Sequence, residues 1–172
     1  GIDSANGILY VNTYLYGVYK CTLTSGCDAS GDFTAATDFP GSFGYRSSSS
    51  VFNNTIANAT STGAIYIAGT DLYRCLTSTN CDAGGEFTTA LDTSDVSIAS
   101  VVFDSANSVI YAGSGTGSGL IYRCPLPSGS TTACTTSTDF TTVYDSTAGS
   151  INALTIDTVN GVLYGVNGGL VR

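Results

Sequence analysis

Short runs in which apolar residues alternate with small or polar ones dominate the chain. Ser97–Asp104 (SIASVVFD) and Ser150–Asp157 (SINALTID) carry β-branched residues at alternating positions, which predicts β-strands. A second apolar run follows each of them after an Asp-x-x-Asn turn, as in Gly161–Val166 (GVLYGV). No run keeps the 3.6-residue period of a helix, and 21 glycines disfavour helices further. The pattern predicts an all-β fold.

The same strand pattern returns with a period of about 50 residues. Asp3–Tyr10 (DSANGILY) is repeated as Asp104–Tyr111 (DSANSVIY) and Asp157–Tyr164 (DTVNGVLY), with a weaker copy at Asn58–Tyr66. In each of the first three repeats, a third strand ending in Tyr-basic-Cys and a fourth strand starting with acid-Phe-Thr come next. In the third repeat these two strands are predicted at Leu120–Cys124 and Asp139–Tyr144. The predicted repeats cover residues 1–49, 50–96, 97–149 and, in part, 150–172.

Four short antiparallel strands in each repeat are typical of a β-propeller blade. The whole chain therefore resembles the extracellular β-propeller repeat proteins. Its turn Asn80–Phe87 (NCDAGGEF) is also similar to the Asp-box turn of sialidase-like propellers, although Ser30 and Thr135 replace the Gly and the Asp of that box in the other repeats. The resemblance implies about three and a half blades of four antiparallel strands, in a single repeat domain or fragment over residues 1–172.

The repeat pattern is incomplete at both ends of the chain. Leu170–Arg172 aligns with Leu72–Arg74, so a cysteine is expected to come next. Closed propellers generally have four to eight blades, and unpaired sheet edges are unstable alone. We therefore expect either a portion of a larger protein or self-association through the incomplete end blades, as two half-rings or as a head-to-tail fibre.

Six cysteines fall as three close pairs, one in each of the three complete repeats. This spacing favours a disulfide within each pair, and therefore one disulfide per blade, because a zinc site needs four converging ligands. Disulfides predict an oxidising compartment, which is extracellular, at the cell surface or periplasmic. The expected pairs are Cys21 with Cys27, Cys75 with Cys81, and Cys124 with Cys134.

Tyrosine recurs at two positions of the repeat, and a basic residue recurs at a third. An aromatic platform for stacking sugars and packing between adjacent blades both fit this pattern, and recurrence in every repeat favours packing. The recurrence of the basic residues favours a structural role in the same way. The tyrosines are Tyr10, Tyr66, Tyr111 and Tyr164 at one position and Tyr19, Tyr73 and Tyr122 at the other; the basic residues are Lys20, Arg74, Arg123 and Arg172.

The residue types that several chemistries require are missing. The chain has no His, which excludes Ser-His-Asp and Cys-His catalysis. A sialidase-like site needs converging arginines and a Tyr–Glu pair, but only Arg46 lies outside the repeated basic positions, and Glu86 is the single glutamate. We expect no enzyme activity, no catalytic residues, no cofactor and no metal. A net charge of −8 without a basic cluster excludes nucleic acid as a partner, and no apolar run is long enough to span a membrane.

Two further sets of residues allow a functional and a structural interpretation. The acid pairs Asp28/Asp32 and Asp82/Glu86 could bind Ca²⁺ with loop carbonyls, but solvated turn acids are the favoured interpretation. Asn53 and Asn58 begin N-glycosylation sequons, and the second is predicted at the tip of a turn. The Ser/Thr-rich segments Ser47–Ser50 and Ser128–Thr138 could carry O-linked sugars or be plain loops. The turn acids Asp3, Asp104 and Asp157 are predicted to cap their own turns.

These observations favour a non-enzymatic extracellular β-propeller module for surface recognition or adhesion, with a glycan or a protein as ligand. The alternative is a structural subunit of an extracellular fibre or surface layer, which the low charge, the disulfides and the incomplete end blades also fit. A lesser alternative is part of a sialidase-like glycosidase whose site lies outside this segment. A threonine-rich ice-binding solenoid is disfavoured because the threonines have no short regular spacing.

Overall fold

The structure, a computed structural model, consists of four antiparallel β-sheets that follow one another in chain order. It describes residues 2–3, 7–13, 17–35, 56–59, 63–79, 81, 85–94, 97–115, 117, 119–127, 130–146, 149–166 and 170–171. Within these residues the regular elements are strands and short 3-10 helices, and no helix is long and apolar enough to cross a membrane. The prediction of an all-β chain is confirmed for this part of the molecule.

Each sheet is a meander in which neighbouring strands in sequence pair with each other. Sheet I contains β1 (Ile2–Asp3), β2 (Ile8–Thr13), β3 (Gly17–Thr22) and β4 (Thr34–Ala35). Sheet II contains β5 (Ile56–Ala59), β6 (Ala64–Ala68), β7 (Leu72–Leu76) and β8 (Thr88–Leu91). Sheet III contains β9 (Ile98–Asp104), β10 (Val109–Ser114), β11 (Gly119–Pro125) and β12 (Thr141–Ser146). Sheet IV contains β13 (Ala153–Asp157), β14 (Val162–Val166) and β15 (Leu170–Val171).

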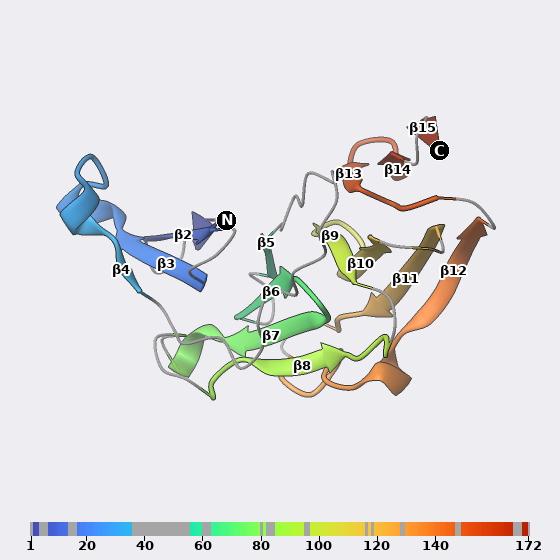
Figure 1. Cartoon of the computed structure of the whole chain (residues 1–172), viewed down its shortest axis with the longest axis horizontal. Coiled ribbons are helices and arrows are strands. Elements are labelled where there is room, and N and C mark those ends of the chain that lie inside the picture. The colour runs from blue at the N-terminus through green and yellow to red at the C-terminus, as the bar shows by residue number, and fades with distance from the viewer. Residues whose placement is uncertain are drawn as a thin grey trace.

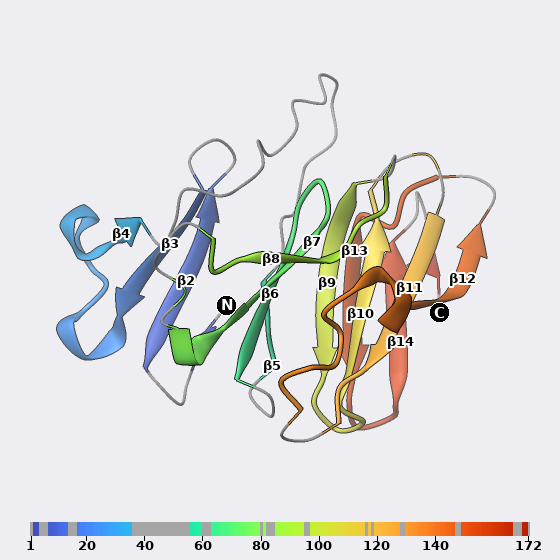
Figure 2. The same ribbon diagram turned by 90° about the horizontal axis from the view of Figure 1, so that it is seen from below.

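The four sheets stand side by side along an open arc (Figure 1). The first strands of the sheets lie toward the inner side of the arc, where β9 contacts both β5 and β13, and β8 and β12 lie on the outer side. Figure 2 shows the sheets from the side: the turns after the first and third strands of sheet III lie at one end of the molecule, together with the turn after the first strand of sheet IV. Residues at the same position of each repeat therefore occupy the same place within their own sheet.

The core lies between the sheets, because each central strand is apolar on both faces. Along β6, Ile65 and Ile67 pack toward sheet I, whereas Ala64, Tyr66 and Ala68 pack toward sheet III. All five side chains are fully buried, so successive residues of one strand serve two different interfaces. A strand buried on both faces does not show the apolar/polar alternation of a half-exposed one.

Two predicted strand boundaries are wrong. The fourth strand of the third repeat was expected at Asp139–Tyr144, but Ser137–Asp139 forms the 3-10 helix η4, and β12 begins at Thr141. The Asp139 carboxylate closes this turn by accepting hydrogen bonds from the backbone N–H groups of Thr135 and Thr136, which competes with strand formation. The strand predicted from Ser150 begins later, at Ala153. Three further 3-10 helices lie in the turns between third and fourth strands: η1 (Leu23–Ser25), η2 (Ser30–Asp32) and η3 (Thr77–Thr79).

Candidate functional site

The two repeated tyrosine positions face opposite sides of each sheet. Tyr66 on β6 lies in the core between sheets II and III, and Tyr10 on β2 packs into the core between sheets I and II. Tyr73 on β7 faces back toward sheet I, and Tyr122 on β11 packs back against sheet II. Tyr10, Tyr66 and Tyr73 are between 0% and 5% exposed, so none of them offers an open ring for a sugar. Their surroundings are those of packing residues.

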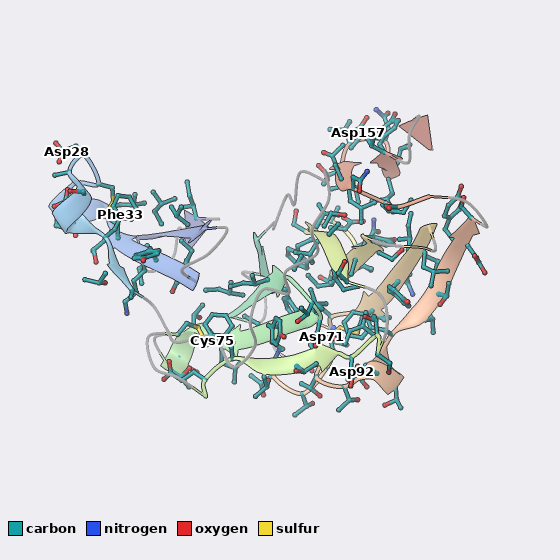
Figure 3. All side chains as sticks on the ribbon, in the orientation of Figure 1. Asp28, Phe33, Asp71, Cys75, Asp92 and Asp157 are labelled. Carbon is teal, nitrogen blue, oxygen red and sulfur yellow. A yellow bond between two sulfur atoms is a disulfide. The ribbon has the colours of Figure 1, made fainter. Side chains whose placement is uncertain are left out.

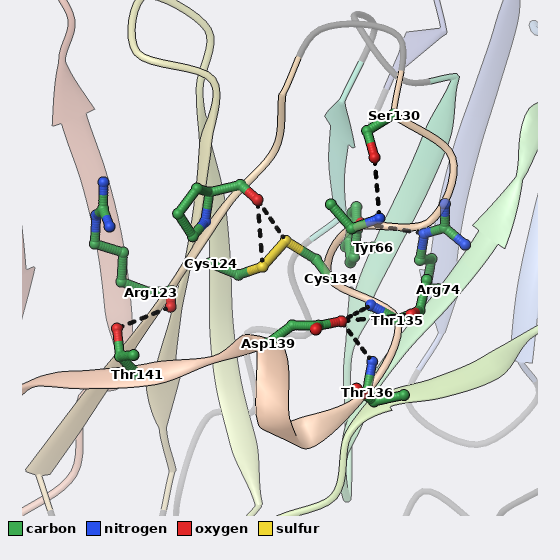
Figure 4. The surroundings of a disulfide bond; sticks show 12 residues. Tyr66, Arg74, Arg123, Cys124, Ser130, Cys134, Thr135, Thr136, Asp139 and Thr141 are labelled. Atoms are coloured by element: carbon green, nitrogen blue, oxygen red, sulfur yellow. Dashed lines mark hydrogen bonds between the residues drawn. A yellow bond between two sulfur atoms is a disulfide. The ribbon is translucent and has the colours of Figure 1, made fainter.

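Tyr66 forms a buried pair with Arg74, which lies directly opposite it on β7. The Arg74 Nε donates a hydrogen bond to the Tyr66 Oη at 3.1 Å (Figure 4). The Arg74 Nη2 donates to the carbonyl oxygen of Thr131 at 2.7 Å. Thr131 lies in the disulfide turn of sheet III, so the pair binds the next repeat directly. Burial raises the pKa of the Tyr66 hydroxyl above its ordinary value, and the Arg74 charge offsets part of this effect.

The same pairing recurs in the neighbouring sheets with different surroundings. Tyr10 lies opposite Lys20 in sheet I, and Tyr111 lies opposite Arg123 in sheet III. Arg123 is half-buried, in contrast to the buried Arg74. In all three sheets a threonine hydroxyl of the fourth strand donates to the carbonyl oxygen of the basic residue, from Thr34, Thr88 and Thr141 at 3.4–3.5 Å. The repeated hydroxyl contact accounts for the Thr of the acid-Phe-Thr step of the sequence.

The structure joins the six cysteines in the three pairs that their spacing favours, Cys21–Cys27, Cys75–Cys81 and Cys124–Cys134. Each disulfide links the end of a third strand to the turn that leads into the fourth. The second and third disulfides pack against the preceding sheet, with all four cysteines at most 1% exposed. The bonds therefore hold the turns and contribute to the core as well.

A hydrogen bond joins the two turns at the same end of each of the first three sheets. The backbone N–H groups of Leu23, Thr77 and Leu126, each shortly after a third strand, donate to the carbonyl oxygens of Gly7, Gly63 and Ser108, each in the turn after a first strand, at 2.7 Å. We call this end of the molecule the turn face. Its described residues are Gly7, 22–33, Gly63, 77–79, 81, 85–87, 104–108, 126–127, 130–140 and 157–161.

Acidic side chains cap the disulfide turns from within. The Asp32 Oδ2 accepts hydrogen bonds from the backbone N–H groups of Asp28 and Ala29 at 3.1 and 2.8 Å. The Asp139 Oδ2 does the same with Thr135 and Thr136 at 2.8 and 3.1 Å. These bonds hold the pKa of the Asp139 carboxyl below its ordinary value, and the bond from the Thr135 backbone N–H has the largest effect. Asp32 therefore caps this turn.

The turns after the first strands are capped by a second set of acids. Asp104 is 2% exposed, and its carboxylate accepts hydrogen bonds from the Ala106 and Asn107 backbone and from the Asn107 side chain at 2.8–3.1 Å. Asp157 makes the equivalent bonds to the backbone of Val159 and Asn160 and to the Asn160 side chain. The bond from the Asn160 side chain is the main reason why the pKa of Asp157 lies below its ordinary value.

One position of these turns adopts the left-handed backbone conformation in all four sheets. Gly7, Gly63 and Gly161 have φ values of 60–66°, and Ser108 takes the same place with a φ of 53°. Glycine adopts this conformation without strain, whereas serine does so at a cost. In the sequence this position follows Asn in three of the four repeats and Thr62 in the other, and it holds Gly everywhere except at Ser108.

Several predicted residues are placed differently or fall outside the described part of the chain. Asn58 lies within β5, opposite Ile65, so its prediction at the tip of a turn is wrong: β5 continues through Ala59 before the chain turns. No cluster of three or more Cys, Asp or Glu side chains that could hold a metal is found among the residues with a described position. Arg46, Asn53, Ser47–Ser50, Asp82, Ser128 and Arg172 lie outside the described residues, and the side chain of Asp3 does as well.

Sequence reasoning identified the repeated residues of this site but missed the turn face itself. The hydrogen bonds between the turns use backbone groups, which leave no mark on side-chain identity. The order of the strands could have indicated the turn face, because in a meander the turns after the first and third strands must lie at the same end of the sheet.

No family model matches the sequence, and no curated protein matches it either. Solved structures do resemble the fold. A chain in a crystal structure of a nidogen/laminin complex superposes with a TM-score of 0.63 at 15% identity, over 98% of this chain and 55% of that one. The extracellular domain of a putative one component system from B. thetaiotaomicron superposes with a TM-score of 0.59 at 21% identity, over 95% of this chain and 19% of that one.

A further structure from B. thetaiotaomicron, described as the extracellular domain of a putative hybrid two component system, has a TM-score of 0.52 at 20% identity. It is matched over 92% of this chain and 18% of its own length. The chain thus spans about half of the first of these proteins and about a fifth of the other two. At these identities the likeness is one of fold.

Proposed function

We propose that the chain is an extracellular recognition module that binds another protein through the turn face and has no catalytic activity. In this proposal each sheet is one blade of a β-propeller, and the chain lies in an extracellular or cell-surface location. Three disulfides, the arc of meandering sheets and the fold likeness to extracellular domains support these assignments.

The observation that carries the proposal is the way in which the turn face is held. Disulfides, acid caps and cross-turn hydrogen bonds fix its backbone, while side chains such as Thr24, Ser105, Thr132 and Val159 remain exposed. Binding residues on loops that a rigid scaffold holds in place lose little conformational entropy when a partner binds. A fixed and exposed surface of this kind suits recognition.

Charge indicates the kind of partner. The ionisable side chains described on the turn face are Asp28, Asp32, Glu86, Asp104, Asp139 and Asp157. Asp104 is buried, and the other five are exposed or half-buried. The lysine and arginines that the structure describes lie on third strands instead, outside this face. An acidic surface attracts basic groups and steers their approach. A protein with a basic patch is therefore favoured over a glycan, since none of the repeated tyrosines that could stack on sugars lies among the described residues of the turn face.

The test is an array of extracellular proteins and glycans probed with the labelled chain at low and moderate ionic strength. We expect binding to basic proteins that weakens as salt is added. Ser105→Arg and Thr132→Arg should abolish it, whereas Val143→Arg, on the outer strand β12, should leave it unchanged. Glycan binding that survives both turn-face variants, or silence on the protein array, would contradict the proposal.

A structural role in a fibre or surface layer remains the second candidate. A specific observation favours it: apolar side chains are exposed on the outer faces of both end sheets, at Val11 on sheet I and Val166 on sheet IV. These faces belong to neither the turn face nor the cores described above.

A further inference from the structure

The outer face of sheet I has the same composition as the face of sheet II that buries Tyr10. On sheet II this face consists of Ile65, Ile67, Tyr73, Phe87 and the Cys75–Cys81 disulfide, all at most 5% exposed beneath sheet I. The equivalent residues of sheet I are Leu9, Val11, Tyr19, Phe33 and the Cys21–Cys27 disulfide.

Strand register places this second set on the side of sheet I that faces away from sheet II. Ile8 and Tyr10 of β2 point into the core shared with sheet II, so Leu9 and Val11 lie on the opposite face. Val11 pairs with Tyr19 and Leu9 pairs with Cys21, which puts all four on that face. Val11 is 37% exposed and Phe33 is half-buried, so this apolar face is open.

The outer face of sheet IV carries residues equivalent to those that sheet I contributes to its junction with sheet II. A Cβ built at Gly165 would lie 3.6 Å from the Ile151 Cγ2 and 3.9 Å from the Ile121 Cδ1, so this position faces sheet III. Val162, Tyr164 and Val166 therefore lie on the other face of β14. Val162 and Tyr164 occupy the repeat positions of Ile8 and Tyr10. Val166 is 44% exposed. Figure 3 shows the two end sheets at opposite ends of the arc, with Asp28 and Phe33 on one and Asp157 on the other.

We propose that the outer face of sheet IV docks onto the outer face of sheet I of a second copy of this chain and reproduces the junction between sheets I and II. Val162, Tyr164 and Val166 of one copy would pack against Leu9, Val11, Tyr19 and the Cys21–Cys27 disulfide of the next. The contact joins two different surfaces, so it closes into a ring or continues as a filament. It rests on the structural alternative of the proposed function and is independent of the turn face.

Net charge acts against this association. Each copy carries −8, so copies repel one another at low ionic strength, and added salt screens the repulsion without weakening apolar contacts. Self-association should therefore strengthen as salt is added, whereas binding of a basic protein to the turn face should weaken. The two responses have opposite signs, which separates failure of the one proposal from failure of the other.

The experiment is sedimentation velocity over a concentration series of the whole chain. The sedimentation coefficient of the unmodified chain should rise with concentration above that of the 17.5 kDa monomer. Val11→Asp and Val166→Asp should each raise the dissociation constant by about tenfold or more, because each places a charge in an apolar contact. Val159→Asp is the matched control, since Val159 is 91% exposed in a turn, and its association should equal that of the unmodified chain.

Mixing the two variants makes the test specific. Val11→Asp keeps an intact sheet IV face, and Val166→Asp keeps an intact sheet I face. An equimolar mixture should therefore form a dimer that neither variant forms alone, and this dimer also shows that both variants are folded. A monomeric unmodified chain at all concentrations, an equal effect of Val159→Asp, or a mixture that stays monomeric would overturn the proposal.

Discussion

Arg74 of sheet II donates a hydrogen bond at 2.7 Å to the carbonyl oxygen of Thr131, which lies 57 residues later in the disulfide turn of sheet III. Arg74 is 6% exposed as a residue, and the second described bond of its guanidinium goes to the fully buried Tyr66. One side chain therefore ties two strands of its own sheet to the turn of the next. Bonds from a charged group across an apolar interface are stronger than neutral ones and expensive to lose.

Replacing Arg74 by methionine should lower the free energy of unfolding by about 2 kcal/mol or more, because the Thr131 carbonyl and the Tyr66 hydroxyl lose their buried partner. Arg123→Met is the matched control, since Arg123 occupies the same repeat position but is half-buried, and its effect should stay below about 0.5 kcal/mol. Urea unfolding measures both. Equal losses in the two variants would show that the bond to the next sheet has no special role.

Ser108→Gly should stabilise the chain by about 0.5–1 kcal/mol, because Ser108 holds the left-handed conformation that glycine adopts at the three equivalent positions. The reciprocal change Gly161→Ser should destabilise by a similar amount. Both side chains project from turns and have room, since nothing lies within 4 Å of a Cβ built at Gly161. Thermal unfolding of the pair should give shifts of opposite sign; shifts of the same sign would disprove the backbone explanation.

Gly113→Ala should destabilise the chain by about 1–3 kcal/mol through overpacking between sheets III and IV. A Cβ at this position would lie 2.6 Å from the Ile151 Cγ2 and 2.7 Å from the Ser100 Oγ. Gly31→Ala, where nothing lies within 4 Å, is the control and should be nearly neutral. Ile151→Ala removes the Cγ2 atom, so the loss in the double variant with Gly113→Ala should be smaller than the sum of the two single losses in denaturant unfolding. Additive losses would place the strain elsewhere.

Removing the Cys124–Cys134 disulfide by a double alanine substitution should cost about 2–3 kcal/mol. The bond closes the longest of the three disulfide turns, with a sequence separation of 10 against 6 for the others. Both cysteines are also buried against sheet II, so packing is lost together with the cross-link. A free-thiol assay confirms the oxidised state of the parent chain. An unchanged melting temperature in the double variant would contradict the assigned role.

The stabilisation by Asp139 should depend on pH in a defined direction. Its pKa is lower in the folded chain than in the unfolded chain, so its contribution is complete above the unfolded value of about 3.9 and disappears as the pH falls through the folded value. The stability difference between the parent chain and Asp139→Asn should therefore be constant from about pH 7 to 5 and shrink toward pH 3. Denaturant unfolding at the three pH values measures it. A difference that grows on acidification would reverse the assignment.

The sequence predicted the parts of this structure that depend on local pattern. Alternation placed β9 and β14 within one residue at each end, and the recurrence of Tyr66 and Arg74 indicated packing rather than a sugar platform. The bond from Arg74 to Thr131 could not be predicted, because it joins residues that only the stacking of sheets brings together. The start of β12 was missed because the Asp139 carboxylate stabilises a local turn over residues whose alternation favours a strand.

The burial of the disulfides has a consequence for the rate of their reduction. Cys21 is 2% exposed but its partner Cys27 is half-buried at the open end of the arc, whereas Cys75, Cys81, Cys124 and Cys134 are all at most 1% exposed beneath a neighbouring sheet. A thiolate must reach a sulfur atom to cleave the bond. The Cys21–Cys27 bond is therefore open to exchange in the folded chain, and the other two react only after adjacent sheets part. The reduction rates of these two disulfides therefore measure how often the junctions that cover them open.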